Sequence, residues 1–296
     1  MLPLIHHPDY DAASVGDDHR FPMRKYSLVA DLLRDRGFEL EAPMHAAQEA
    51  LERAHDPAYV HGVLTSSLDA KTARRVGFEM TPAIAARTRA SVGGTMLAAH
   101  RALEMGAAVN LAGGSHHADD QGGAGFCVFN DVAVAALSLL DDGRVKRVAV
   151  IDLDVHHGDG TALIFADDPR VFTASLHCEE NWPRTKPPSD LDLGLARETG
   201  DAEYLAAAEQ LVRRTLVAAC PDLVFYNAGV DPHIDDRLGL LSLSDEGLRA
   251  RDRLVAQACN EHGLPVVGVL GGGYSKDAGA VALRHTYLVD ALQEIV

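Results

Sequence analysis

The chain alternates between short apolar runs and longer segments with a helical pattern of apolar and polar residues. The apolar runs lie at residues 2–5, 107–111, 148–153, 171–176, 223–228 and 265–270. Runs of this kind lack the two-residue alternation of a half-exposed strand, so they predict strands that are buried on both faces of a parallel sheet. The longer segments predict helices. They lie at residues 27–36, 82–105, 130–140, 201–220, 244–262 and 276–296.

Glycines and capping residues mark the ends of these predicted helices. Each of four helical patterns is followed by a glycine, the usual left-handed stop. These are Gly37, Gly106, Gly143 and Gly263. Thr81 and Pro82 predict a helix start, since a capping residue precedes a proline at the first helical position. Residues 71–80 and 178–199 show neither pattern and are predicted as loops, and a loop as long as the second is usually functional or mobile.

Strands alternating with helices predict an α/β fold, a three-layer domain with a mostly parallel sheet. The chain of 296 residues suits one large domain, with two small ones as the weaker alternative. Repeats, low-complexity tracts and a linker are missing from the sequence. We therefore expect a single domain over residues 1–296.

Charge and composition narrow the classes of partner. The chain has 27 Lys and Arg against 43 Asp and Glu, a formal charge of −16. This field repels a nucleic-acid backbone and attracts cationic substrates, although the acidity could equally serve solubility alone. The apolar runs fall short of the ~20 residues of a membrane span. We expect neither a nucleic-acid nor a membrane partner, and the sequence leaves the oligomeric state open.

The cysteines and the N-terminal segment indicate the compartment. The four cysteines are scattered and form no CxxC pair, which is typical of reduced thiols. The segment MLPLIHHPDYD lacks the basic and apolar regions of a secretory signal. We therefore expect a cytoplasmic protein.

The stretch DLDVHHGDG, at residues 152–160, has the densest group of aspartates and histidines in the chain and directly follows an apolar run. In an extended chain Asp154 and His156 point to the same side, so they can reach a common point, with Asp152 behind them. An aspartate and a histidine that converge at a strand end suit zinc or a similar divalent ion. The alternative is a polar turn that starts a helix, with Asp159 as its cap.

Three other apolar runs also end in polar or glycine-rich chemistry. They are followed by GGSHHA with His116 and His117, by GVD with Asp231, and by GGGY with Tyr274. Open parallel sheets bind ligands beyond the carboxyl ends of their strands. The four strand ends therefore predict one shared active site at one edge of the sheet.

These motifs together resemble a known enzyme family. GGSHHA, GFCVFND, DLDVHHGDG, GVD and GGGY occur in the order seen in the zinc-dependent deacetylases of the histone deacetylase superfamily, which share the arginase-like α/β fold. The resemblance covers nearly the whole chain. The stretch CEENWPRTKPPSD, after SLH, looks closer to the class IV-like and bacterial branch than to class I.

The resemblance implies a metal centre formed by Asp154, His156 and Asp231. Three protein ligands leave an open position for water and substrate, as a catalytic zinc needs, and ferrous iron is the alternative metal. The family also carries a structural potassium ion bound through backbone carbonyls, and the corresponding residues here are Asp152, Asp154, His156, Ser175 and Leu176.

The resemblance also assigns catalytic roles. Asp152 would orient His116 and Asp159 would orient His117. His117 would act as general base and then as acid, while His116 would act mainly through its charge. Tyr274 would bind the scissile carbonyl oxygen opposite the metal.

Substrate contacts are expected from Gly125, whose backbone lies near the substrate amide in the family, and from Phe126 on the acyl-lysine tunnel wall. Trp182 could supply the opposite wall or simply pack on the surface. Looser correspondences place Lys25 or Arg24 near the foot of the site and Glu79 at its rim.

The expected function is a zinc-dependent amidohydrolase that removes an acetyl or other acyl group from protein lysine side chains by metal-activated water. One alternative is a deacylase of small acylated amines such as acetylpolyamines. Another, from a different class, is a non-catalytic module that binds acyl-lysine.

Overall fold

The computed structural model describes residues 1–12, 15–16 and 19–296. Its centre is an eight-stranded sheet with the order β2-β1-β3-β8-β7-β4-β5-β6, in which all described strand pairs are parallel. The strands are β1 (Leu4–Ile5), β2 (Leu40–Glu41), β3 (Ala107–Asn110), β4 (Val148–Asp152), β5 (Val171–Cys178), β6 (Leu191–Leu195), β7 (Leu223–Asn227) and β8 (Val266–Val269). The predicted α/β class with a mostly parallel sheet is confirmed.

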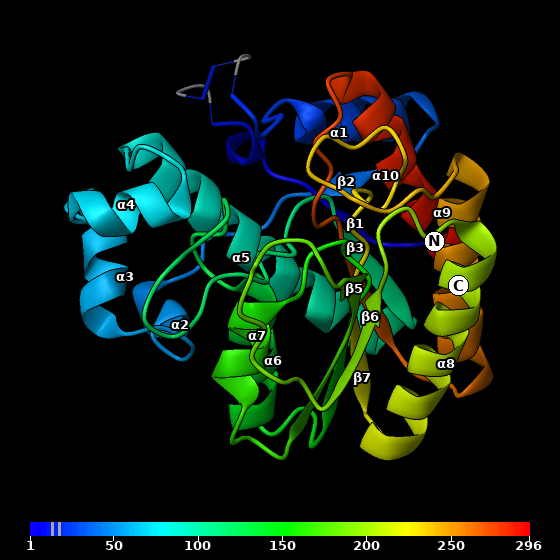
Figure 1. Cartoon of the computed structure of the whole chain (residues 1–296). Helices are drawn as coiled ribbons and strands as arrows, with labels where there is room; N and C mark the ends of the chain where they lie inside the picture. Colours follow the sequence, from blue (N-terminus) through cyan, green and yellow to red (C-terminus); the bar gives the residue numbers. More distant parts are fainter. Residues whose placement is uncertain (13–14, 17–18) are drawn as a thin grey trace.

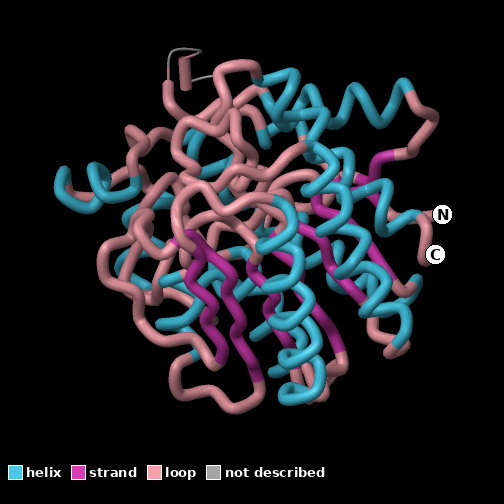
Figure 2. The backbone as a smooth tube through the Cα atoms, turned by 45° about the vertical axis from the view of Figure 1, so that its right-hand side comes forward, coloured by secondary structure: helices cyan, strands magenta, loops and turns pink. Residues whose placement is uncertain are grey.

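Helices cover both faces of this sheet. In Figure 1, α5, α6 and α7 lie on one side of the strands, and α8, α9 and α10 lie on the other, with α1 against α10. Figure 2 shows the strands side by side beneath the helices of the second group. The described helices are α1 (Lys25–Asp35), α2 (Gln48–Leu51), α3 (Pro57–Leu64), α4 (Ala70–Val76), α5 (Pro82–Met105), α6 (Asp131–Asp141), α7 (Asp159–Phe165), α8 (Asp201–Ala219), α9 (Asp245–Glu261) and α10 (Ala278–Gln293), with a 3₁₀ turn at Pro8–Tyr10.

The central strands owe their positions to their apolar residues. Every residue of β3, β4, β7 and β8 is buried, as the unbroken apolar runs predict. The helix ends also follow the sequence signals. The Thr81 side chain accepts a hydrogen bond from the Ile84 N–H at the start of α5, and Gly106 ends that helix with a φ of +90°.

The four strands that carry the predicted chemistry are neighbours, in the order β3-β8-β7-β4. Their last residues also lie level with one another. Asn110 pairs with Val269, which pairs with Asn227, which pairs with Asp152. The segments that follow these residues therefore emerge side by side at one edge of the sheet, as the motifs predict.

The prediction of a loop over residues 71–80 is wrong, because α4 occupies Ala70–Val76. The Asp69 side chain accepts hydrogen bonds from the N–H groups of Lys71 and Thr72, and Gly77 ends the helix with a φ of +87°. The helix is short, and its strongest signal is this aspartate cap rather than an apolar stripe.

The prediction of an uninterrupted loop over residues 178–199 is also wrong. It contains β6, which pairs with β5 at the edge of the sheet. Only the two end residues of β6, Leu191 and Leu195, are buried. An aspartate and a glycine inside LDLGL weaken the sequence signal, because both residues are depleted in strands.

Candidate active site and metal centre

Three side chains converge beyond the carboxyl ends of β4 and β7. His156 Nδ1 lies 3.1 Å from Asp154 Oδ1 and 3.2 Å from Asp231 Oδ2. One potential ligand atom from each residue lies within 4.8 Å of the others, and all three residues are buried. The structure thus brings together the three residues expected to bind a metal.

The electrostatics of this cluster favour a cation. Burial and the neighbouring Asp154 charge raise the pKa of Asp231 to about 7. Burial alone would lower the pKa of His156, but hydrogen bonds to Asp154 and Asp231 raise it to about 10. Two buried carboxylates thus compete for one positive charge, and a divalent ion would neutralise both. The donor set of two carboxylates and one imidazole fits zinc or ferrous iron.

Backbone donors hold the two carboxylates in place. The Gly272 N–H donates to Asp154 Oδ2 at 2.7 Å, and the Val155 N–H donates to Asp231 Oδ1 at 2.9 Å. A Cβ atom at position 272 would lie 2.0 Å from Asp231 Oδ2. Only glycine therefore allows the GGGY segment to approach both carboxylates.

The tandem histidines lie beside this cluster, each with its own carboxylate. His116 Nδ1 lies 2.7 Å from Asp152 Oδ2, and His117 Nδ1 lies 2.6 Å from Asp159 Oδ1. Each contact engages one ring nitrogen and leaves Nε2 for other partners. Asp159 is the first residue of α7 rather than its cap, which is Gly158.

The two histidines have opposite pKa shifts. Burial would lower the pKa of His116, but the charges of Asp152 and Asp154 raise it to about 9. Burial and the neighbouring His116 charge lower the pKa of His117 to about 3, despite the opposing contact with Asp159. In this arrangement one imidazole carries a proton while its neighbour is neutral.

Tyr274 is anchored through its backbone. Its N–H donates to Asp236 Oδ2 at 2.6 Å, and its carbonyl oxygen accepts a hydrogen bond from Arg237 Nε at 2.7 Å. The ring centroid lies 6.2 Å from that of His156. Asp236 lies outside the motifs noted in the sequence, and the structure shows that its turn positions Tyr274.

A cavity of about 240 Å³ connects these groups to the surface. It is lined by Arg20, His117, Gly125, Phe126, His156, Asn181, Trp182, Leu238 and Tyr274. The predicted substrate-binding residues, a tandem histidine, a metal-centre histidine and the tyrosine thus share one space. Arg20, Asn181 and Leu238 were not predicted, since they lie outside the recognised motifs.

Phe126 and Trp182 form two aromatic walls of this cavity. Gly125 has a φ of +54°, and a Cβ there would lie 2.8 Å from the Trp182 ring. The Trp182 ring stands edge-on to His117, with a centroid distance of 4.5 Å. Trp182 was expected either to form a cavity wall or to pack on the surface. The structure supports the cavity wall, although 44% of the residue remains exposed.

The less specific predictions, for Lys25, Arg24 and Glu79, have different outcomes. Lys25 is fully buried near the foot of the site, where its Nζ donates to the Gly271 carbonyl at 3.0 Å. Burial lowers its pKa to about 8, against the charges of Asp231 and Asp154. Arg24 instead lines a neighbouring cavity. Glu79 is exposed and lies outside the group of described residues that line the candidate cavity.

A buried arginine beneath the candidate metal centre was missed by sequence reasoning. Arg251 of α9 donates to the Gly229 carbonyl at 2.5 Å and to the Leu153 carbonyl at 3.4 Å. Leu153 lies one residue before Asp154, and Gly229 lies two residues before Asp231. Arg251 also pairs with the buried Asp252 at 2.9 Å. Its position in an amphipathic helix predicts an exposed side chain, so only its burial reveals this role.

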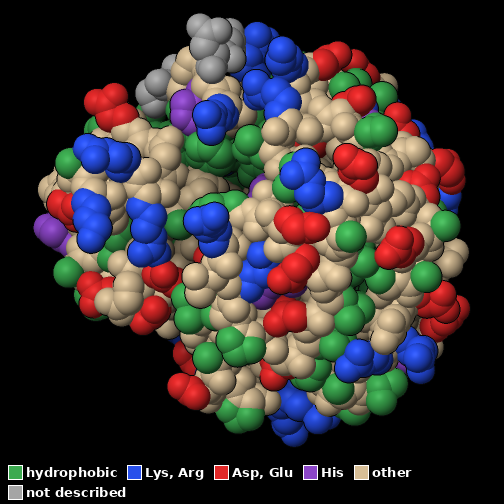
Figure 3. Space-filling model, in the orientation of Figure 1, with side chains coloured by type: hydrophobic (Ala, Val, Ile, Leu, Met, Phe, Trp, Pro, Cys, Tyr) green, Lys and Arg blue, Asp and Glu red, His purple; other side chains and the backbone are tan. Residues whose placement is uncertain are grey.

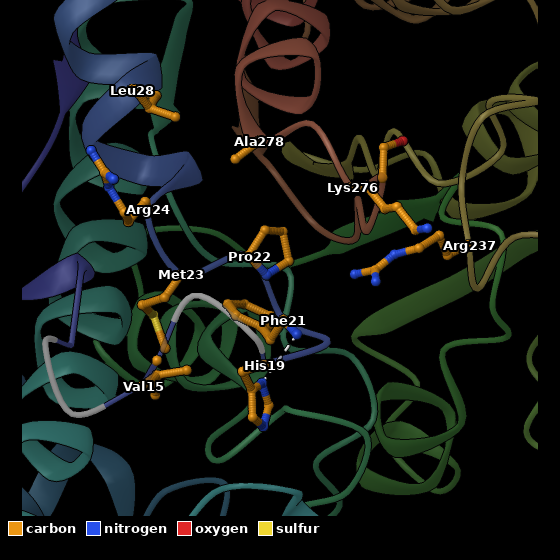
Figure 4. A pocket seen from close by; sticks show the side chains of 12 residues that line it. Val15, His19, Phe21, Pro22, Met23, Arg24, Leu28, Arg237, Lys276 and Ala278 are labelled. Atoms are coloured by element: carbon orange, nitrogen blue, oxygen red, sulfur yellow. Dashed lines mark hydrogen bonds between the residues drawn. The ribbon is translucent and has the colours of Figure 1, made fainter.

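A second hollow of about 440 Å³ lies next to the candidate cavity, with Phe21 in its wall (Figure 4). Among the described residues that line the two hollows, the Lys, Arg, Asp and Glu side chains are Arg20, Arg24, Arg237 and Lys276. On the face of the molecule shown in Figure 3, positive and negative side chains are interspersed. The acidity of the chain is therefore not concentrated on these linings, which favours its role in solubility.

The histone deacetylase domain family matches residues 19–290 of this chain. The chain therefore belongs to the histone deacetylase family, and the expectation of a deacetylase, a hydrolase, is confirmed at the level of the family. The part of the chain that the structure describes contains no helix that is both long enough and apolar enough to cross a membrane.

Relatives extend over nearly the whole chain. An uncharacterized protein of Picosynechococcus is 43% identical over 99% of both chains. Histone deacetylase 2 of Arabidopsis thaliana is 31% identical over 95% of this chain and 76% of its own length. The acetoin utilization protein AcuC of Bacillus subtilis is 30% identical over 92% and 77%. A crystal structure of the HDA15 HD domain superposes with a TM-score of 0.81 at 22% identity, covering 98% of this chain and 89% of the other, which shows the same fold.

Proposed function

We propose that this protein is a zinc-dependent amidohydrolase that removes acetyl or other acyl groups from lysine side chains, with ferrous iron as the alternative metal. Asp154, His156 and Asp231 would hold the ion. A divalent ion at this centre supplies Lewis acidity toward a carbonyl oxygen and lowers the pKa of water.

The chain's own residues would perform the remaining steps. His117, with Nδ1 held by Asp159, would accept a proton from the attacking water at Nε2 and later donate it to the leaving amine. His116, paired with Asp152, would remain protonated and stabilise developing negative charge. The Tyr274 hydroxyl would donate a hydrogen bond to the oxyanion. Phe126 and Trp182 would flank the acyl-lysine stem and keep bulk water away.

The observation that carries this proposal is the shared cavity. His117, His156 and Tyr274 line one space together with the two aromatic walls. A non-catalytic acyl-lysine module needs the walls but not two histidine–aspartate pairs. The four described cysteines are free, which supports the expected cytoplasmic location. From the resemblance to the family, we also propose a structural potassium ion. It would be bound by backbone carbonyls around Asp152, Asp154, His156, Ser175 and Leu176.

The test is a substrate panel with zinc-loaded and iron-loaded protein. Acyl-lysine peptides of several acyl lengths are compared with acetylated polyamines, and His117→Ala serves as the control for contaminating activity. Higher kcat/KM on the peptides supports the proposal. Higher kcat/KM on the polyamines would replace it with the small-amine alternative. Binding of acyl-lysine without turnover by either metal form would replace it with the binding module.

A further inference from the structure

A second cluster of metal-binding side chains lies outside the candidate active site. It consists of His157, from the turn after β4, His177 of β5 and Asp192 of β6. One potential ligand atom from each lies within 4.8 Å of the others, as in the candidate metal centre. We call these three residues the flanking cluster.

The contacts in the flanking cluster orient its ligand atoms. His157 Nε2 lies 3.1 Å from Asp192 Oδ1. His177 Nδ1 lies 3.0 Å from Ser175 Oγ, which leaves Nε2 of that ring for another partner. The carboxylate of Glu179 lies 3.5 Å from this Nε2. His177 is thus fixed as metal-ligating histidines commonly are, through a hydrogen bond at the nitrogen that does not bind the metal.

Burial prepares the flanking cluster further. Both imidazoles are buried, and the nitrogen of His157 that does not face Asp192, Nδ1, has no hydrogen-bond partner among the described residues. The Asp192 side chain is 30% exposed, which gives an ion a route from solvent.

The flanking cluster spans the segment that carries Trp182. Its two anchor points, His177 and Asp192, lie on the strands before and after this segment, and β5 and β6 pair directly. Within the segment, Lys186 Nζ donates to the backbone carbonyls of Glu179, Asn181 and Pro183. The Lys186 ammonium thus organises the centre of the segment. The flanking cluster lies where the two ends of the segment meet the sheet.

We propose that the flanking cluster is a second metal site, which binds a divalent transition metal such as zinc through His157, His177 and Asp192, with Glu179 as an available fourth ligand. Two imidazoles with one or two carboxylates are a donor set typical of zinc. The ion would join the turn after β4 to β5 and β6 and thereby hold the Trp182 segment against His117. Its effect on substrate binding rests on the proposed function, whereas its binding of metal does not.

The test counts metal ions and isolates the second one. Protein stripped with a chelator is titrated with Zn²⁺ by calorimetry and with Co²⁺ by visible absorption. We expect two equivalents for the native chain and one for Asp192→Asn, which keeps the shape of the side chain but removes its charge. Asp154→Asn should lose the equivalent at the metal centre and keep the one at the flanking cluster. The double variant, with both Asp154→Asn and Asp192→Asn, should bind none. A single equivalent in the native chain would overturn the proposal.

Controls separate the flanking cluster from other sites. His7, Asp9 and His45 also form a candidate group, so Asp9→Asn is the matched control and should keep both equivalents. Loss of the second equivalent in Asp9→Asn, with both retained in Asp192→Asn, would move the site to that group and overturn the proposal. His177→Gln provides an independent second variant. For turnover, Asp192→Asn should raise KM about two- to tenfold through the loosened aromatic wall, with little change in kcat.

Discussion

His156 and His157 are adjacent in sequence but belong to two different clusters. His156 lies between the carboxylates of Asp154 and Asp231, all of them buried. His157 contacts a single, partly exposed carboxylate and the edge of another imidazole, whose ring centroid is 4.7 Å away. The charges that face a buried imidazole decide its state, as one histidine from each cluster shows. Two carboxylates raise the pKa of His156 to about 10, whereas burial lowers that of His177 to about 4.

The largest effect should come from removing a carboxylate of the metal centre. Asp231→Ala should lose the metal equivalent bound there and at least about 10³-fold in turnover, because an ion acting as a Lewis acid contributes several kcal/mol to transition-state stabilisation. Metal analysis and kcat measure this, and circular dichroism checks that the fold is kept. Asp192→Asn, in the flanking cluster, is the comparison and should keep kcat. Full metal occupancy in Asp231→Ala would remove that residue from the centre.

Tyr274→Phe removes only a hydroxyl from the candidate cavity. We expect kcat to fall roughly 10²- to 10³-fold with metal content unchanged, since an oxyanion donor acts mainly in the transition state. KM should change much less. The alternative is a tyrosine that only fills space beside Phe126. Near-native kcat with full metal content would favour that alternative and weaken the case for a deacetylase-type site.

A third buried histidine tests the rule about facing charges. His55 has neutral backbone partners, since its Nδ1 faces the Asp119 carbonyl and its Nε2 accepts from the Asn130 N–H. Burial lowers its pKa from 6.5 to about 4. Between these values the unfolded chain binds a proton that the folded chain does not, so stability is retained above pH 6.5 and falls as the pH drops toward 4. The expected loss is about 3 kcal/mol at most.

Denaturant unfolding across this pH range measures the loss. His55→Gln lowers stability at every pH through lost hydrogen bonds, so the slope and not the absolute value is compared. The variant should show a shallower fall between pH 6.5 and 4 than the native chain, while His6 and His177 maintain part of the slope. An unchanged slope would show that His55 is already protonated in the fold.

The smallest effect concerns Arg251, which binds backbone carbonyls beneath the metal centre. Arg251→Met should weaken metal binding at the centre by about 10- to 100-fold, as loss of an outer-shell partner commonly does. It also leaves Asp252 buried without its partner, so Arg251→Lys, which keeps the charge, is the second variant. Arg251→Lys should restore folding but only part of the metal affinity, because one ammonium cannot reach all the carbonyls that the guanidinium binds. Native affinity in a folded variant would make Arg251 a purely structural residue.

Much of the candidate site could be predicted because its residues follow apolar runs directly. Asp154, Asp231 and Tyr274 each come within five residues of the end of a central strand. Asp236, Arg237 and Arg251 could not be predicted in this way. They act through backbone groups of distant segments, as when Arg237 binds the Tyr274 carbonyl, and such contacts leave no local pattern. α4 and β6 escaped prediction because their signals are a single aspartate cap and a half-exposed edge strand.

The sequence alone determined which strands are buried and which side chains follow them, because periodicity and capping depend on residues only a few positions apart. The order β3-β8-β7-β4 was decided by the tertiary structure, since it depends on how the helical crossovers pack on the two faces of the sheet. That order brings Asp231 to Asp154 across 77 residues of chain. It also decides that His156 faces two carboxylates while His157 faces the edge strand, a distinction that two adjacent letters cannot carry.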